Sequence, residues 1–295
     1  DMSVFRGLVD KFEQQQQMES SRDLSNDVIE LVSSSDKSAY YLAKNRRQLF
    51  VSGDGMPRAD KYMYEPIQDA LPDSVATEIS NDPFLRIKQI SSGSSHTLVL
   101  FNDNRILAFG SDNHCQTGGA KTGTWIEYSF PSPIRFLYSG SFHSFYLTEQ
   151  KVYSSGYSGD HRLGHDLSGR IHEITCFDQL PSQEWFVEDI IGRASTMFVV
   201  RDENNVRRLF NIGSNHYGEA GIGCTGSLAE VKEVQDPLIC TLINDSSLNF
   251  RHACGYYFRF LYFTRVHRSI DGFYANLQRF RQEHDFTDVV FTFQL

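Results

Sequence analysis

A short element built around a glycine recurs along this chain, and this repeat limits the folds open to it more than any other feature. Residues 90–100 read ISSGSSHTLVL and residues 137–147 read LYSGSFHSFYL, so that Gly93 and Gly140 lie 47 residues apart. Weaker copies occupy residues 189–200, 32–42 and 252–263. A period of about 40 to 50 residues is typical of folds that stack one small structural unit several times.

A second element, a short apolar run that ends in glycine, alternates with the first. Its five copies end at Gly7, Gly53, Gly110, Gly156 and Gly213. In the clearest unit, residues 97–101 form an apolar run, residues 102–104 (NDN) are typical of a turn, and residues 105–109 return as a partner strand. Because these strands are apolar on both sides, we expect each hairpin to be covered by neighbouring units on both faces.

Two motifs make this unit similar to the regulator-of-chromosome-condensation repeat, which carries G-x-x-H-[ST] and then a strand pair ending in G-x-N-x-x-G-Q-L-G. His96 and His143 match the histidine of the first motif, where we expect them to satisfy nearby backbone groups. The stretch GSNHYGEAG from Gly213 is close to the whole second motif, and GSDNHCQTG and GYSGDHRLG keep parts of it. The resemblance covers residues 28–264 and implies a β-propeller.

Members of that family usually have seven blades, whereas this sequence carries signals for about five. Either the chain is a fragment, or its ring closes with five blades, the run from Ser3 to Gly7 supplying outer strands that are missing after Gly255. We favour closure, because it would remove exposed strand edges. We therefore predict an all-β fold, a β-propeller of about five blades over residues 1–264.

The C-terminal residues predict a different organisation. Residues 265–283 are expected to form a linker with a short helix, because apolar residues follow a helical spacing. These residues are Phe273, Leu277 and Phe280. Residues 284–295, which include HDFTDVVFTF, resemble the start of a BTB/POZ domain, a helix followed by a D-F-x-D-V-x-F strand. The matching residues are Asp285, Phe286, Asp288, Val289 and Phe291.

The sequence gives only weak support for a catalytic, metal-binding or phosphate-binding site. His161 and His165 are four residues apart, but Gly164 and its turn-like surroundings argue against a metal-binding helix. The region 139–143 holds serines beside His143 without a third catalytic group, and residues 156–169 lack a phosphate-binding loop. We therefore predict no enzyme and no catalytic, cofactor-binding or metal site, and the sequence does not identify partner-binding residues. The acidic residues 202–203 and 230–233 are expected to form a solvated rim.

The cysteines and the termini bear on where the protein works. The five cysteines form no C-x-x-C pair, so we expect buried free thiols in a reducing compartment. They are Cys115, Cys176, Cys224, Cys240 and Cys254. No signal peptide or membrane-spanning run is visible. The sequence thus favours an intracellular protein, cytoplasmic or nuclear, that does not enter membranes.

Charge and repeats together favour a scaffold for protein–protein interaction. The net charge of −9 argues against a broad nucleic-acid surface, which needs clustered Lys and Arg. The two resemblances imply a propeller that recruits targets for a cullin ubiquitin ligase, with cullin bound through a BTB domain of which residues 284–295 would be only the start. The alternative is guanine-nucleotide exchange on a small GTPase, as in the founding type of the repeat family. Chromatin or phosphoinositide binding is disfavoured by the acidity.

Overall fold

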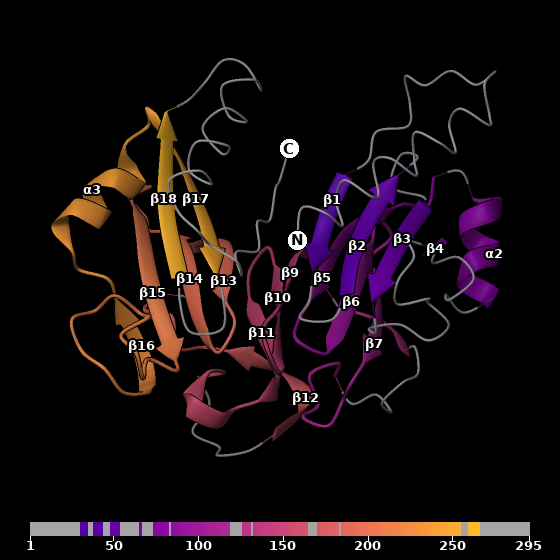
Figure 1. Cartoon of the computed structure of the whole chain (residues 1–295), viewed down its shortest axis with the longest axis horizontal. Coiled ribbons are helices and arrows are strands. Elements are labelled where there is room, and N and C mark those ends of the chain that lie inside the picture. The colour runs from indigo at the N-terminus through magenta and orange to yellow at the C-terminus, as the bar shows by residue number, and fades with distance from the viewer. Residues whose placement is uncertain are drawn as a thin grey trace.

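Five antiparallel sheets follow one another along the chain (Figure 1). This computed structural model describes residues 30–34, 38–43, 48–53, 65–66, 73–82, 84–118, 126–130, 132–164, 170–182, 184–254 and 259–265. The first four sheets have four strands each, hydrogen-bonded in chain order, and the described part of the fifth has two. The predicted all-β propeller of about five blades is therefore confirmed.

Each sheet is one repeat. The first contains β1 (Glu30–Ser34), β2 (Ser38–Ala43), β3 (Gln48–Gly53) and β4 (Glu65–Pro66). The second contains β5 (Ile87–Ser92), β6 (His96–Phe101), β7 (Arg105–Gly110) and β8 (Ile126–Ser129). The third contains β9 (Ile134–Ser139), β10 (His143–Thr148), β11 (Val152–Tyr157) and β12 (Arg170–Phe177). The fourth contains β13 (Phe186–Gly192), β14 (Ser195–Arg201), β15 (Arg207–Gly213) and β16 (Leu228–Glu233), and the fifth contains β17 (Leu248–Cys254) and β18 (Arg259–Arg265).

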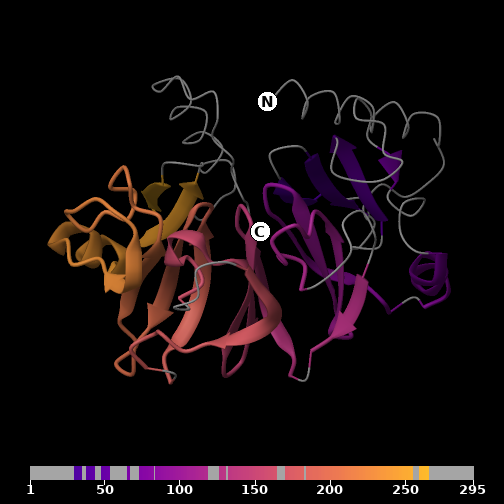
Figure 2. The same ribbon diagram turned by 90° about the horizontal axis from the view of Figure 1, so that it is seen from below.

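The sheets stand side by side around an arc, with their first strands toward its inside (Figures 1 and 2). Strand β5 packs against β1 and β9, and β13 packs against β9 and β17. Two α-helices of the described chain lie in the connections between sheets, α2 (Asp73–Asn81) before β5 and α3 (Pro237–Asn244) before β17. None of the helices in the described ranges is long and apolar enough to cross a membrane.

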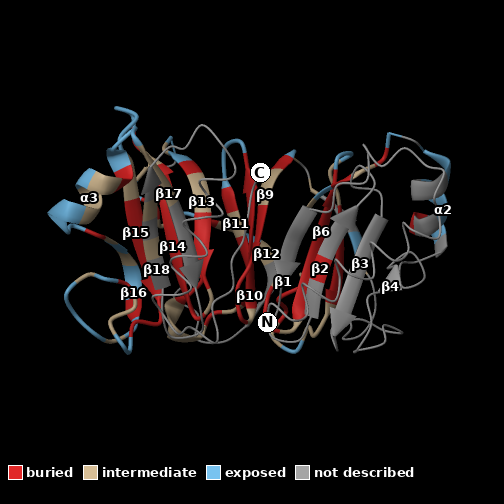
Figure 3. Cartoon of the chain, turned by 45° about the horizontal axis from the view of Figure 1, so that its top comes forward, coloured by how far each residue is buried: buried red, intermediate tan, exposed pale blue. Residues whose placement is uncertain are grey.

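Apolar side chains fill the space between neighbouring sheets, as the two-sided pattern of the strands predicts. Phe145 of β10, Phe177 of β12 and Phe198 of β14 are fully buried between the third and fourth sheets. The rings of Phe177 and Phe198 stack at 4.9 Å, and Phe145 meets both edge-on. Burial of one such ring contributes about 1.5 to 3 kcal/mol. The central strands of the second, third and fourth sheets are consequently mostly buried (Figure 3).

The antiparallel order gives the molecule two distinct faces. Successive connections lie at opposite ends of the strands, so the β6–β7, β10–β11 and β14–β15 turns share one end with the links between sheets. We call this end the turn face, and it comprises residues 102–104, 149–151, 202–206 and the described residues of the links, which are 84–86, 130, 132–133, 178–182, 184–185 and 234–247. The opposite end, the loop face, carries residues 93–95, 140–142, 193–194 and the glycine-rich loops 111–118, 158–164 and 214–227.

Polar side chains hold the turn face together. Asn104 sits in the β6–β7 turn with a positive φ of 74°, which asparagine tolerates better than most residues. Its amide nitrogen donates to the carbonyl oxygens of Phe130 and Ser132, each at 3.3 Å. Its oxygen accepts the backbone N–H of Ile134 at 2.6 Å. One turn residue therefore fastens the link into the next sheet.

The expectation of a solvated acidic rim is wrong for Asp202. This residue is 6% exposed, and its Oδ1 accepts the backbone N–H groups of Asn204 and Val206, both at 2.9 Å. Its Oδ2 accepts Nε of Arg208 at 2.8 Å. Asp202 therefore shapes the β14–β15 turn, whereas Glu203 and Glu230 are exposed as predicted.

Several predictions fall on residues outside the described ranges. These are the closing strand at residues 3–7, the linker and helix at 265–283, and the BTB-like segment at 284–295. Closure of the ring by the N-terminal residues, and the domain boundaries drawn from the sequence, stay predictions.

Candidate functional site

The two repeat histidines connect neighbouring blades. His96 of the second sheet lies 2.8 Å from Oγ of Ser144 in the third, and His143 of the third lies 3.0 Å from Oγ1 of Thr196 in the fourth, each through Nε2. Ser144 donates its own hydroxyl proton to the carbonyl oxygen of Gln116 at 2.7 Å, so it accepts from His96. The expectation that these histidines satisfy nearby backbone groups is therefore wrong, because their partners are hydroxyl groups of the next blade.

The glycine of the G-x-x-H motif makes room for the imidazole ring. A Cβ atom added to Gly140 would lie 2.2 Å from Cε1 of His143, and one added to Gly93 would lie 2.3 Å from Cε1 of His96. No side-chain carbon approaches another atom this closely without displacement. The motif is therefore a packing unit in which the ring lies where a side chain would otherwise begin.

Both histidines are uncharged and have a structural role as links between blades. Burial lowers the pKa of His96 to about 3. Burial, reinforced by the charge of Arg162 and by His96, holds the pKa of His143 well below its usual value. The nearby Ser139 donates to the carbonyl oxygen of Ser91 at 3.1 Å, whereas His143 contacts Thr196. The side-chain hydrogen bonds of Ser139 and His143 therefore join neighbouring blades, and neither of them pairs a serine with His143.

The first blade replaces the histidine contact with a phenol. The sequence carries Ser38 at the histidine position of this blade. Two residues later, the buried Tyr40 accepts a hydrogen bond at 2.9 Å from Oγ1 of Thr97, which follows His96 in the second blade. The connection between blades is thus kept while its chemical form changes.

A polar cluster joins the loops of the third and fourth blades on the loop face. Oδ2 of Asp160 pairs with Nη2 of Arg162 at 2.9 Å, and its Oδ1 accepts the hydroxyl of Ser227 at 3.1 Å. Nε2 of His216 lies 3.5 Å from Asp160 and 3.3 Å from Ser227. A catalytic triad places the acid and the serine on opposite ring nitrogens. Here both meet the same nitrogen, so the cluster fastens two loops together.

The predicted metal and thiol features have structural positions. His161 ends the short 3-10 helix Gly159–His161, and His165 lies outside the described residues. No group of three potential metal ligands occurs within the described part of the chain. Cys115 is a buried free thiol and Cys176 and Cys240 are partly buried, but Cys224 is exposed, so the expectation of burial is wrong for that residue. Cys224 lies in the glycine-rich loop 214–227 outside the sheets, which accounts for its exposure.

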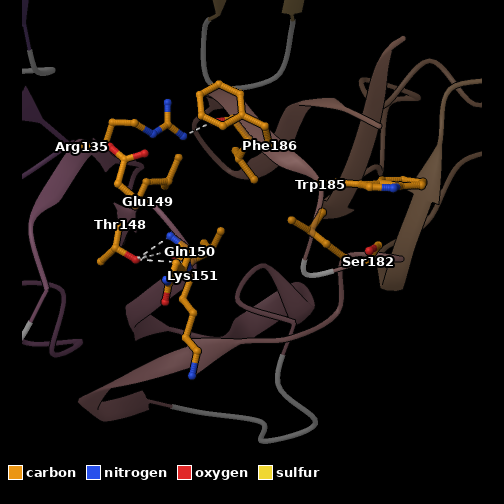
Figure 4. Close-up of a pocket in the computed structure, with 12 residues that line it drawn as sticks. Arg135, Thr148, Glu149, Gln150, Lys151, Ser182, Trp185 and Phe186 are labelled. Atoms are coloured by element: carbon orange, nitrogen blue, oxygen red, sulfur yellow. Dashed lines mark hydrogen bonds between the residues drawn. The ribbon is translucent and has the colours of Figure 1, made fainter. Parts of the chain in front are cut away.

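A pocket lies on the turn face between the third and fourth blades (Figure 4). Strand β9 supplies Arg135, the end of β10 and the β10–β11 turn supply residues 148–151, and the link into β13 and the start of this strand supply Trp185 and Phe186. Thr148 fixes this turn: its Oγ1 accepts the backbone N–H of Lys151 at 3.0 Å and donates to the carbonyl oxygen of the same residue at 3.1 Å. The rim of the pocket is therefore held by bonds within its own turn.

Arginine and aromatic rings meet in this pocket. The guanidinium carbon of Arg135 lies 4.1 Å from the centre of the Phe186 ring, which is 44% exposed. The indole N–H of Trp185 donates to Glu203 at 2.5 Å, and the guanidinium of Arg208 lies over the indole at 5.7 Å. Tryptophan and arginine are enriched among the residues that dominate protein–protein binding energies. The pocket therefore has the composition of a binding anchor for another protein.

Exposed apolar side chains gather at the same end of the strands. Among the described residues, five large apolar side chains are strongly exposed. Four of them, Phe84, Phe186, Val206 and Leu238, lie in turns, links or strand starts at the turn face, whereas Tyr217 lies in a loop of the loop face. No motif of the repeat predicts these residues, because they lie in the connections or at a strand start, outside the two recurring elements.

Comparisons with known proteins agree with this architecture. Residues 87–116, which run from β5 into the first glycine-rich loop, match the family model of the regulator of chromosome condensation (RCC1) repeat. Over 142 residues the chain is 28% identical to the dog X-linked retinitis pigmentosa GTPase regulator, covering 45% of this chain and 14% of that protein.

Solved structures share the fold. Human WBSCR16 superposes with a TM-score of 0.62 at 16% identity, covering 81% of this chain and 58% of that one. Yeast RCC1 (Prp20) in complex with Kap60 gives a TM-score of 0.61 at 15% identity, covering 90% and 59%. A second structure of Prp20p, from Saccharomyces cerevisiae, gives a TM-score of 0.59 at 15% identity, covering 88% of this chain and 61% of that one. The chain thus spans about three fifths of the length of these structures and a smaller part of the curated relative.

The fold and the inter-blade contacts define this chain as a β-propeller. Residues 87–116 of its second blade match the RCC1 repeat, and the chain shares the propeller fold of yeast RCC1.

Proposed function

We propose that this chain is a protein-binding propeller that presents its turn face to a partner. The observation that carries the proposal is the pocket between the third and fourth blades, where Arg135 meets an exposed aromatic ring. RCC1-type propellers are binders or exchange factors, which agrees with a scaffold role. We further propose an intracellular location, in the cytoplasm or the nucleus, where cysteines remain as thiols.

The finer role that we propose is recruitment of targets to a cullin ubiquitin ligase. It is supported by the resemblance of residues 284–293 to the start of a BTB/POZ domain. In this arrangement the propeller would hold the target, and a BTB domain in the natural full-length protein would hold the cullin. The two functions would reside in separate parts of one polypeptide.

Affinity purification of the natural full-length protein tests this role. We expect a cullin to copurify, and to remain bound when Phe186→Ala alters the propeller, because the two surfaces are separate. Failure to recover any cullin, while limited proteolysis shows a folded domain that includes residues 284–295, would exclude the ligase role. The propeller could then still bind partners.

A second candidate is nucleotide exchange on a small GTPase. It is favoured by the fold shared with Prp20p, whose structure was reported together with its binding to Gsp1p and histones, and by a curated relative described as a GTPase regulator. Release of a fluorescent guanine nucleotide from a panel of small GTPases measures this activity directly. Acceleration by this chain would place exchange ahead of recruitment, and unchanged release across the panel would remove it.

A further inference from the structure

One arginine on the turn face differs from its neighbours. Arg201 and Arg207 share the carboxylate of Glu188, and Arg208 pairs with two acidic residues. Arg135, in contrast, makes no ion pair with any carboxylate of the described residues. Its guanidinium donates to the carbonyl oxygen of Val187, and its Nε is buried without a partner among them.

The charge of Arg135 is only partly balanced by the protein. Burial lowers the pKa of its guanidinium below the usual value, although Glu149, Asp189 and Glu188 act through space in the opposite direction. Glu188 already forms ion pairs with two other arginines, Arg201 and Arg207. Burial also raises the pKa of Asp189 to about 7, so this residue carries only part of a negative charge at neutral pH. A carboxylate brought from outside would therefore gain a strong, charge-assisted contact.

Glu149 lies beside the pocket but does not fill this role. It is exposed on the rim turn, and it influences Arg135 through space without forming an ion pair. An incoming carboxylate would be repelled by Glu149 while it is attracted by Arg135. Glu149 is therefore expected to weaken the binding of an acidic ligand.

The apolar part of the pocket indicates what surrounds that carboxylate. Phe186 covers one side of the guanidinium and leaves 44% of its own surface exposed, and Leu180 and Trp185 line the same pocket. An inorganic anion would leave these surfaces uncovered. A polypeptide with an apolar side chain next to Asp or Glu would cover them and pair with the arginine at the same time.

We propose that the Arg135–Phe186 pocket binds an acidic segment of a partner protein, in which an Asp or Glu carboxylate pairs with Arg135 and an adjacent apolar side chain packs on Phe186. This inference rests on the proposed function, since it names the chemistry of the partner that the propeller would bind. It goes further than the proposed function, because it predicts that the chain recognises a single carboxylate of the partner, the one that pairs with Arg135.

Selection of peptides tests the proposal without knowledge of the natural partner. A display library of random 12-residue peptides would be selected on this chain, and the peptides recovered would be measured for binding to Arg135→Gln. We expect an enriched group with Asp or Glu next to an apolar residue, whose affinity falls about tenfold or more in Arg135→Gln. The affinity of this group should also fall as salt is added.

Further variants separate the parts of the pocket. Arg135→Lys keeps the charge but loses the planar fork and should bind between the parent and Arg135→Gln. Glu149→Gln should tighten binding a few-fold, because it removes a repelling charge. Lys232→Gln, which removes an exposed positive charge on β16, serves as the matched control and should bind like the parent. Thermal melting of each variant shows that its fold is intact.

The outcomes distinguish the pocket from the wider function. Peptides that bind this chain but are indifferent to Arg135→Gln would overturn the pocket and leave a binding propeller in place. Arg135-dependent peptides without acidic residues would overturn the proposed chemistry. Recovery of no binding peptides at all would argue against both the pocket and a peptide-binding turn face.

Discussion

Removal of one buried histidine should change how the stability of this protein depends on pH. The pKa of His96 is about 3 in the folded chain, against about 6.5 for an ordinary histidine. Below about pH 6.5 the unfolded chain therefore takes up a proton that the folded chain refuses, and stability is lost as the pH falls toward 3. Each pH unit corresponds to about 1.4 kcal/mol, so at about pH 5 this one residue costs about 2 kcal/mol.

His96→Gln tests this calculation, because glutamine can still donate to Ser144 but does not titrate. Urea unfolding at about pH 7 and about pH 5, followed by tryptophan fluorescence, gives the free energy of unfolding at each pH. We expect acidification to cost the variant about 2 kcal/mol less than the parent. Thr97→Val removes the equivalent contact with Tyr40 and introduces no titration, so its loss should be the same at both pH values. If the free energy of unfolding of His96→Gln falls between the two pH values by as much as that of the parent, the reasoning is refuted.

Other residues give further tests by the same unfolding assay. Asp189→Asn should stabilise the protein at about pH 8 more than at about pH 5. Burial raises the folded pKa of Asp189 from 3.8 to about 7, so the unfolded chain releases this proton first and stability is lost as the pH rises from about 4 to about 7. Equal changes at both pH values would contradict this. Phe198→Ala should lower the free energy of unfolding by about 3 to 5 kcal/mol through the cavity it leaves, and a loss below about 1 kcal/mol would show that the interface collapses around it. Gly140→Ala should destabilise by about 1 to 3 kcal/mol because the added carbon overlaps the His143 ring, and it should cost more than Gly221→Ala, where the positive φ is strained but nothing lies within 4 Å.

The sequence predicts the repeating part of this fold well, because its signals are local. Strand, turn and strand lie within about 15 residues of one another in each unit, and the G-x-x-H motif fixes where each unit begins. The same motif does not reveal the partner of its histidine. Ser144 lies 48 residues after His96 in the chain, and a small hydroxyl residue in a strand carries no distinctive pattern.

The pocket on the turn face could not be predicted for a related reason. Arg135, the turn at 148–151 and Phe186 belong to two different blades and meet only because β9 and β13 pack together. None of them belongs to a motif, and their importance depends on an ion pair that Arg135 does not form within the described chain. Asp202 illustrates the opposite error, since an acidic residue in a turn sequence is usually solvated, yet here it organises the turn.

The direction of the histidine contacts has a consequence for synthesis on the ribosome. Each imidazole belongs to an earlier blade and its hydroxyl partner to the next one, as in His96 with Ser144 and His143 with Thr196. A newly made blade therefore holds an unsatisfied ring until about 50 more residues have left the exit tunnel. During synthesis, the blade made last would therefore stay exposed. Its histidine would lack a partner until the next blade is made, or until a chaperone covers the exposed surface.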